Sequence, residues 1–109
     1  DNYPSTKHYA ILKNESVVSA LTIIERTTNK KKSAQLRGMF TVQKELKKGY
    51  GSLLIDKVSF KLKKENMSLI WCNSRINVID FYKKNKFKEI GKTFSINLLG
   101  DHKKLIRKL

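Results

Sequence analysis

Apolar and β-branched residues dominate the N-terminal third of the chain, which predicts β-strands. Residues 8–13 (HYAILK) and 16–27 (SVVSALTIIERT) are two such runs, and Asn14-Glu15 between them has turn-forming chemistry. We therefore expect a β-hairpin. The charged tract that follows, 28–32 (TNKKK), predicts a solvent-exposed loop.

A third strand and a long helix come next in the pattern. Residues 33–42 (SAQLRGMFTV) resume a strand pattern, and Gly38 inside it indicates a bulge or a close approach to the backbone. Residues 49–66 place apolar side chains at helical spacing, which predicts an amphipathic helix. Its expected apolar positions are Tyr50, Leu53, Leu54, Val58 and Leu62.

The C-terminal part predicts one buried strand, a second helix and a final hairpin. Residues 68–72 (SLIWC) form a short apolar run of the kind buried on both faces of a sheet. Residues 77–85 read as a helix. Residues 87–99 and 102–109 read as strands joined by a tight turn at Gly100-Asp101.

The predicted order of elements is β-β-β-α-β-α-β-β within one domain, residues 1–109. The third strand, the long helix and the strand that starts at residue 68 form a β-α-β crossover. Such a crossover requires parallel strands and a right-handed connection. The remaining hairpins are antiparallel. We therefore expect an α+β fold with a mixed sheet and flanking helices.

Positive charge dominates the composition, with 24 basic against 9 acidic residues and a net charge of +15. Residues 1–29 are neutral overall, so the excess lies in residues 30–109. Such a field attracts nucleic acid, anionic lipid or a phosphate-bearing small molecule. However, 20 of the 24 cations are lysines, whereas specific phosphate recognition favours the arginine fork. A solvated lysine surface that reflects codon bias is therefore an equal alternative.

Several classes of protein are disfavoured by what the sequence lacks. Its longest apolar stretch, 17–24, is interrupted by polar residues, so we expect no membrane span and no signal peptide. Cys72 is alone, which excludes an internal disulfide and a multi-cysteine zinc site. We expect a cytoplasmic protein without a metal.

The segment 45–52 (ELKKGYGS) carries the clearest candidate chemistry, because it lies where a strand ends and a helix begins. A helix start has unpaired N–H groups and a partial positive charge, and two glycines let the backbone approach a phosphate. The spacing matches neither a P-loop nor a dinucleotide fingerprint. The alternative is a turn of purely structural importance. The expected anion cradle comprises Lys47, Lys48, Gly49, Tyr50, Gly51 and Ser52.

Two longer motifs resemble a known family. The run QLRGMFTVQKELKKGYGSLLI resembles the acyl-CoA-binding motif of the GNAT superfamily of N-acetyltransferases, and WCNSRINVIDFYKKNKF resembles its later strand–helix motif. The tail IGKTFSINLLGDHKKLIRKL is similar to the closing hairpin of small bacterial members. Together the resemblance covers residues 8–109. It implies the GNAT fold, in which two parallel strands of the sheet splay apart.

The chain departs from the family pattern at four positions. Leu46 stands at the Gln/Arg position of the acyl-CoA motif, and Lys47 replaces a frequent glycine. Arg75 stands where an asparagine is common, and Lys86 replaces the glycine before the last Phe. The first helices of typical members are also missing from this chain, and these helices help to build the acceptor pocket.

The resemblance implies a place for acetyl-CoA. Its pantetheine arm would lie between the splayed strands, with Phe40, Thr41 and Val42 opposite residues 71–73, and a strand N–H near these three would stabilise the oxyanion. The diphosphate would bind the amides of residues 47–52. Arg75 is expected near a CoA phosphate or the substrate, and Lys84 near the adenosine phosphate.

The resemblance also implies the reaction. Tyr82 occupies the family's Phe-Tyr position and is expected to protonate the leaving thiolate, although a core aromatic is the structural alternative. No general base is evident, and Glu25 is a candidate for which a hydrogen-bonded surface carboxylate is the favoured alternative. The expected activity is acetyl transfer from acetyl-CoA to a primary amine of a small molecule or a protein.

Two other functions remain as alternatives. One is a CoA-binding or regulatory module without catalysis, which the missing helices and the missing base favour. The other is a nucleic-acid-binding protein, which the lack of a recognition-helix signature disfavours. A homodimer is left open.

Overall fold

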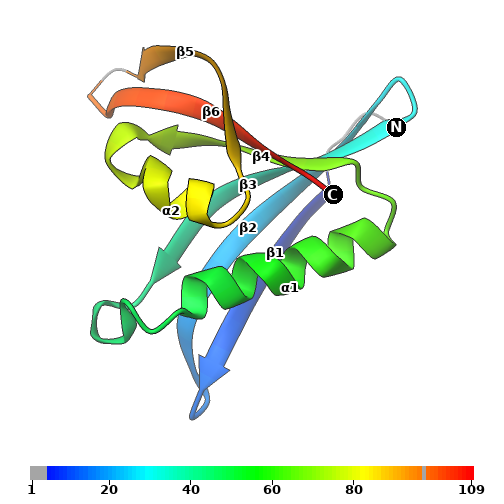
Figure 1. Cartoon of the computed structure of the whole chain (residues 1–109). Coiled ribbons are helices and arrows are strands. Elements are labelled where there is room, and N and C mark those ends of the chain that lie inside the picture. Colours follow the sequence, from blue (N-terminus) through cyan, green and yellow to red (C-terminus); the bar gives the residue numbers. More distant parts are fainter. Residues whose placement is uncertain (1–4, 97) are drawn as a thin grey trace.

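The computed structural model describes residues 5–96 and 98–109, and these fold into a six-stranded mixed sheet with two α-helices (Figure 1). The predicted α+β class is confirmed. Short 3₁₀ turns at Gln43–Glu45 and Ile76–Val78 precede the two helices. The main elements are β1 (Ser5–Lys13), β2 (Ser16–Thr28), β3 (Lys31–Thr41), α1 (Tyr50–Lys64), β4 (Leu69–Arg75), α2 (Ile79–Lys84), β5 (Lys88–Ile96) and β6 (Gly100–Lys108).

The strands lie in the order β1-β2-β3-β4-β6-β5. The pair β3–β4 is parallel and the other neighbours are antiparallel. The connection between β3 and β4 passes through α1, which is the predicted crossover. Both α1 and α2 lie in front of the sheet in Figure 1, and α2 lies near the start of α1.

Two-residue turns join the first three strands. Asn14 and Glu15 both have positive φ, as do Asn29 and Lys30. Positive φ at both central residues is the backbone of a type I′ turn, whose twist matches that of the flanking strands. The predicted hairpin is confirmed. The predicted loop 28–32 is wrong, because β2 continues to Thr28 and β3 begins at Lys31, which leaves only a tight turn at Asn29-Lys30.

Gly38 lies at a β-bulge, as its position within the strand predicted. On one side Ala20 pairs with Phe40, and on the other Thr22 pairs with Arg37, so the β3 strand contains one extra residue. Gly38 has φ of +58°, a left-handed conformation that glycine adopts without strain.

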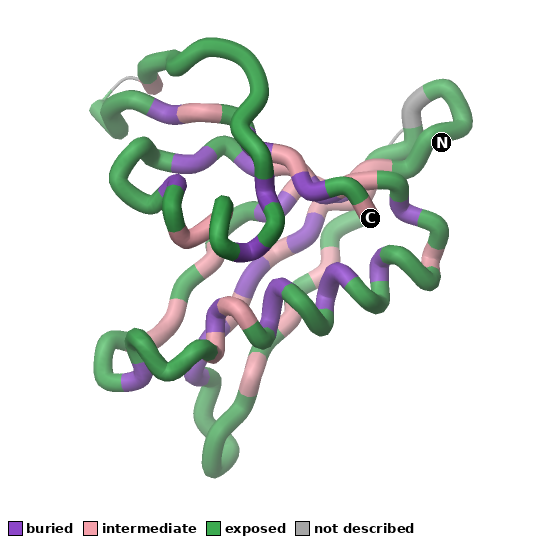
Figure 2. Tube along the Cα trace, viewed as in Figure 1, coloured by how far each residue is buried: buried purple, intermediate pink, exposed green. Residues whose placement is uncertain are grey.

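The core lies between α1 and the sheet, where the buried segments of the two face each other in Figure 2. The helix prediction has one error in its apolar face: Leu53 is 44% exposed, while Ile55 is buried. Within the described chain, neither helix has the length and apolar content that a membrane crossing requires. The main buried residues are Leu21, Ile23, Ala34, Leu36, Leu54, Ile55, Val58, Leu62, Ile70, Cys72, Phe87 and Leu105.

β4 is buried on one face, so the prediction of two buried faces is wrong. Ile70 and Cys72 point into the core, whereas Trp71 on the other face is half-exposed. The Lys104 ammonium lies 4.7 Å from the centroid of the Trp71 ring. A cation with a long aliphatic stem thus covers this aromatic side chain.

The last hairpin turns earlier than predicted. Gly100 pairs with Ile96 as the first residue of β6, and the Leu99 amide donates to the Ile96 carbonyl at 2.9 Å. Leu98 has φ of +66°. The chain therefore reverses before Gly100-Asp101, and Asn97 within the predicted strand 87–99 lies outside the described residues.

Candidate functional site

The parallel strands β3 and β4 pair over only part of their length. Three residue pairs join them, and the last is Gln35 with Trp71. β3 then continues to Thr41 and β4 to Arg75, and the two strands diverge (Figure 1). The expected position of Phe40–Val42 opposite residues 71–73 is wrong, because Trp71 pairs with Gln35. The divergence leaves backbone groups of both strands without a strand partner.

Thr41 presents its backbone to this gap. The Val42 amide donates to the Val18 carbonyl at 2.8 Å, and Phe40 pairs with Ala20, two residues further along β2. Successive residues of an antiparallel strand direct their N–H and C=O groups to opposite edges. Val42 and Phe40 therefore face β2, and Thr41 between them faces the β4 side.

The turn before α1 has the geometry of an anion site. Lys47 has φ of +63° and Gly49 has φ of +85°, and the helix begins at Tyr50. Gly49 supplies no capping side chain, and the first helical turn contains no acidic residue. The Leu53 amide donates to the Gly49 carbonyl at 3.0 Å. The N–H groups of residues 50–52 therefore precede the first helical bond and can bind an anion.

Gly51 has a different role from the one its spacing suggested. A Cβ at this position would lie 3.1 Å from the Met39 Cε and 3.1 Å from the Phe81 Cζ. Gly51 therefore allows β3, α1 and α2 to pack closely. The absent side chain serves this packing and not the approach of a phosphate to the backbone. At Gly49 a Cβ would meet nothing within 4 Å, so its positive φ is what favours glycine there.

A buried carboxylate anchors the same turn. Glu45 is 6% exposed, and the Lys13 and Lys48 ammonium groups each lie 3.3 Å from its Oε1. Burial opposes ionisation of Glu45, but hydrogen bonds from the two lysines outweigh it and lower its pKa. No local sequence pattern indicates this role of Glu45, because its partner Lys13 is distant in sequence. Lys48 is thus ion-paired in this structure, while Lys47 is exposed.

Glu45 makes the stability of the turn depend on pH. Its lowered pKa means that its stabilising effect is present above the pKa of an unfolded glutamate, and is lost as pH falls through the folded pKa. We expect Glu45→Gln to reduce the free energy of unfolding at pH 7, with a smaller difference from wild type at pH 3. Urea unfolding at both pH values measures this. Glu15→Gln, at an exposed turn, is the control, and an equal deficit at both pH values would contradict the role of Glu45.

Tyr82 lies between two aromatic rings on α2. Its ring centroid is 5.3 Å from that of Phe81 and 5.4 Å from that of Phe87, both in edge-to-face geometry. Burial, with a smaller contribution from the Cys72 thiol, raises the pKa of Tyr82 to about 12. The phenol is therefore neutral near pH 7 and retains a proton that it can donate. Since Phe81 also contacts the Gly51 position, α2 holds Tyr82 close to the start of α1.

Arg75 and Lys84 are exposed side chains at the ends of β4 and α2. Glu25 lies elsewhere: its Oε1 is 3.4 Å from the Lys7 ammonium, which also lies 3.7 Å from Glu65 at the C-terminal end of α1. This is the opposite end of α1 from the turn at residues 45–52, so the position argues against Glu25 as a base.

Cys72 is a core residue and offers no reactive thiolate. Cys72 is buried, and burial raises the pKa of its thiol to about 12, which keeps it protonated. Cys72 therefore acts as a small core residue. Within residues 5–96 and 98–109, no group of three His, Cys, Asp or Glu side chains is arranged to hold a metal ion.

Comparison with known proteins identifies the family. The sequence profile of the acetyltransferase (GNAT) family matches residues 1–87. The chain is 37% identical over 68 residues to the uncharacterized N-acetyltransferase YitI of Bacillus subtilis (strain 168), a match that covers 62% of this chain and 46% of that protein. The chain thus spans less than half the length of this curated relative.

Two solved structures share the fold. A GNAT-family acetyltransferase from Staphylococcus aureus Mu50 superimposes with a TM-score of 0.78 and 25% identity, over 99% of this chain and 72% of that chain. An acetyltransferase from Bacillus subtilis in complex with CoA gives a TM-score of 0.73 and 16% identity, over 95% of this chain and 77% of that chain. Together with the profile match over most of its length, these likenesses show that the chain belongs to the GNAT family of acetyltransferases.

Proposed function

We propose that this protein binds acetyl-CoA and transfers its acetyl group to a primary amine of a small molecule or a protein. The divergence of β3 and β4 beside an uncapped helix start carries this proposal. It offers unpaired strand edges and unpaired helical amides next to each other, which suit an amide-containing arm linked to a diphosphate. Family membership and the CoA-bound structural neighbour support the same ligand.

The proposed binding mode uses the backbone more than side chains. The Thr41 carbonyl accepts a hydrogen bond from an amide of the pantetheine arm, which acts as an added strand in the gap. The N–H groups of residues 50–52 bind the diphosphate, and the Ser52 hydroxyl and Lys47 ammonium add to this binding. Arg75 and Lys84, at the open ends of β4 and α2, are proposed contacts for the remaining phosphate or the substrate.

The proposed reaction is direct transfer. The neutral amine attacks the thioester carbonyl carbon, and the Thr41 N–H stabilises the oxyanion of the tetrahedral intermediate. As the carbon–sulfur bond breaks, Tyr82 donates its proton to the leaving sulfur. The proton lost by the amine passes to water, and Tyr82 is reprotonated from solvent. The products are the acetylated amine and CoA with a free thiol.

Acetyl-CoA should stabilise the protein against unfolding. At a concentration of one hundred times its dissociation constant, we expect a gain of about 2.7 kcal/mol in the free energy of unfolding. Urea unfolding with acetyl-CoA, free CoA or ATP measures this, and ATP is the control for general attraction of polyphosphates to a chain of charge +15. Equal stabilisation by ATP would contradict a specific CoA site.

Turnover separates an enzyme from a binding module. We expect free CoA thiol to appear when a panel of primary amines and amine-bearing peptides is added with acetyl-CoA. Stabilisation by acetyl-CoA without thiol release over the whole panel would instead indicate a CoA-binding module. If acetyl-CoA causes no stabilisation and no CoA thiol is released, the proposal is overturned.

A further inference from the structure

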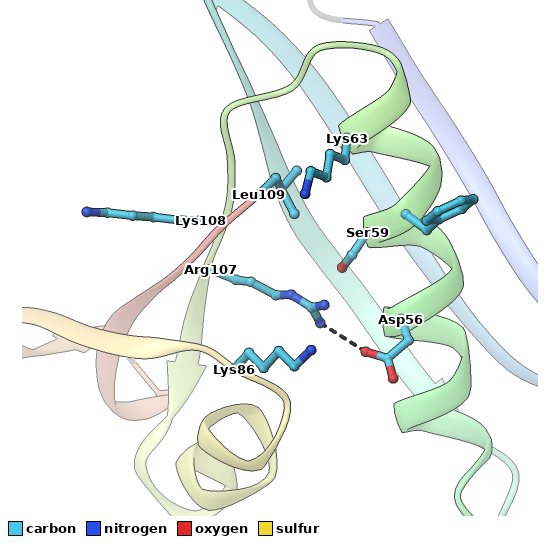
Figure 3. A pocket seen from close by; sticks show the side chains of 8 residues that line it. Asp56, Ser59, Lys63, Lys86, Arg107, Lys108 and Leu109 are labelled. Carbon is cyan, nitrogen blue, oxygen red and sulfur yellow. Dashed lines mark hydrogen bonds and ion pairs between the residues drawn. The ribbon is translucent and has the colours of Figure 1, made fainter.

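A pocket of about 380 Å³ lies between the middle of α1, Lys86 in the segment that joins α2 to β5, and the end of β6 (Figure 3). None of its lining residues belongs to the turn at residues 45–52 or to the gap between β3 and β4. Its volume is within the range of small-molecule sites. The pocket is lined by Asp56, Ser59, Phe60, Lys63, Lys86, Arg107, Lys108 and Leu109.

Arg107 forms a fixed, buried cation in this pocket. The residue is 9% exposed, and its Nη1 donates to Asp56 Oδ1 at 3.2 Å and to the Asn85 carbonyl at 3.2 Å. The Asp56 side chain is 59% exposed, so water weakens its compensation of the buried charge. Among the described residues, no protein group accepts a hydrogen bond from Nε or Nη2. These donors can therefore bind an anion.

Ser59 provides a second unsatisfied group. It is 3% exposed, and its hydroxyl has no hydrogen-bond partner in the described part of the chain. A buried hydroxyl without a partner is destabilising, so it calls for an explanation. In Figure 3 the hydroxyl points from α1 toward the Arg107 guanidinium. The Ser59 hydroxyl and the Arg107 guanidinium are thus two donors directed at the same part of the pocket.

Lys86 adds a cation at a position that favours glycine. Its φ is +72°, a left-handed conformation that is strained for a residue with a Cβ. Figure 3 shows its side chain directed toward α1, beside Arg107, whereas Lys108 extends away. Arg107 and Lys86 therefore lie beside the Asp56 carboxylate, and Lys63 lines the same pocket further along α1.

We propose that this pocket binds a phosphomonoester, separately from acetyl-CoA. The dianion has three terminal oxygens, which match the Arg107 fork, the Lys86 ammonium and the Ser59 hydroxyl as separate donors. Phe60 and Leu109 supply apolar surface for the carbon-containing part of the ligand. Occupation would satisfy the Ser59 hydroxyl and neutralise the buried guanidinium. The site does not depend on the proposed acetyl transfer.

Amide chemical shifts measured during titration with glycerol 3-phosphate or inorganic phosphate, at constant ionic strength, test this site. We expect both probes to shift the amides of Ser59, Lys86 and Arg107. Ser59→Ala should weaken binding about tenfold, the size expected for one hydrogen bond to a charged group. This variant should fold normally, because it removes a hydroxyl that has no partner.

Two comparisons make the outcome decisive. Lys63→Gln/Lys86→Gln should weaken binding, whereas Lys57→Gln/Lys92→Gln, with the same change in net charge at exposed sites outside the pocket, should leave it unchanged. Equal losses in both pairs, or no saturable shifts at the pocket, would overturn the proposal. Saturating acetyl-CoA should leave the phosphate affinity unchanged. If acetyl-CoA displaces the phosphate probe, the pocket is part of the CoA-binding site, and the proposal of a separate phosphomonoester site is overturned.

Discussion

Tyr82→Phe is expected to lower kcat for acetyl transfer by about 10²- to 10⁴-fold, the contribution of a positioned general acid. The change removes only the hydroxyl. The ring keeps its edge-to-face contacts with Phe81 and Phe87, so α2 should retain its position. Because the pKa of Tyr82 is raised to about 12, the wild-type phenol should remain an acid throughout an assay from pH 7 to about pH 10.

Initial rates of CoA thiol release measure the effect of Tyr82→Phe, and the KM for acetyl-CoA should change little. Tyr9→Phe is a matched control, because it makes the same chemical change at a buried hydroxyl that has no partner among the described residues. Tyr9 lies on β1 beside Lys61 of α1, away from the gap between β3 and β4. Unchanged turnover in Tyr82→Phe across this pH range would show that Tyr82 is a core residue without a catalytic role.

Gly51→Leu is expected to cost about 3 kcal/mol of folding stability, near the top of the usual range for overpacking. A Cβ alone would lie 3.1 Å from both Met39 and Phe81, and the leucine side chain adds further atoms beyond the Cβ in this crowded space. Its insertion should push apart the end of β3 and the helix that carries Tyr82. A displacement of about 1 Å in such a site can cost about 100-fold in rate.

Gly49→Ala is the control for Gly51→Leu. Its Cβ would meet open space, so its cost is the conformational one of about 1–2 kcal/mol for a left-handed residue. Urea unfolding with and without acetyl-CoA separates the two variants. We expect Gly49→Ala to retain stabilisation by acetyl-CoA and Gly51→Leu to lose it. Full retention in Gly51→Leu would contradict the inferred packing role of Gly51.

The local signals in the sequence predicted most of the fold. Apolar periodicity located both helices, and Gly38 indicated the bulge, because these features depend on neighbouring residues. The tight turn at Asn29-Lys30 was missed, because the surrounding lysines resemble a loop although Asn tolerates positive φ. The last turn was misplaced because Gly100-Asp101 is turn-forming in isolation, yet Gly100 pairs with Ile96.

The site was predictable in outline but not in its contacts. The glycines of segment 45–52 and its position before a helix indicated an anion site, and the structure has an uncapped helix start there. The ion pair of Glu45 with Lys13 joins residues far apart in sequence, so no local pattern reveals it. The contact of Gly51 with Phe81 likewise depends on how α2 packs against α1.

The position of β6 within the sheet has a consequence for biosynthesis. β6 is the last strand in sequence, yet it lies between β4 and β5 and pairs with both. β5 therefore gains its neighbour only after residues 100–108 have left the ribosome, and until then β4 exposes an unpaired edge. We expect nascent chains stalled before residue 100 to depend on chaperones, because an open apolar edge favours aggregation.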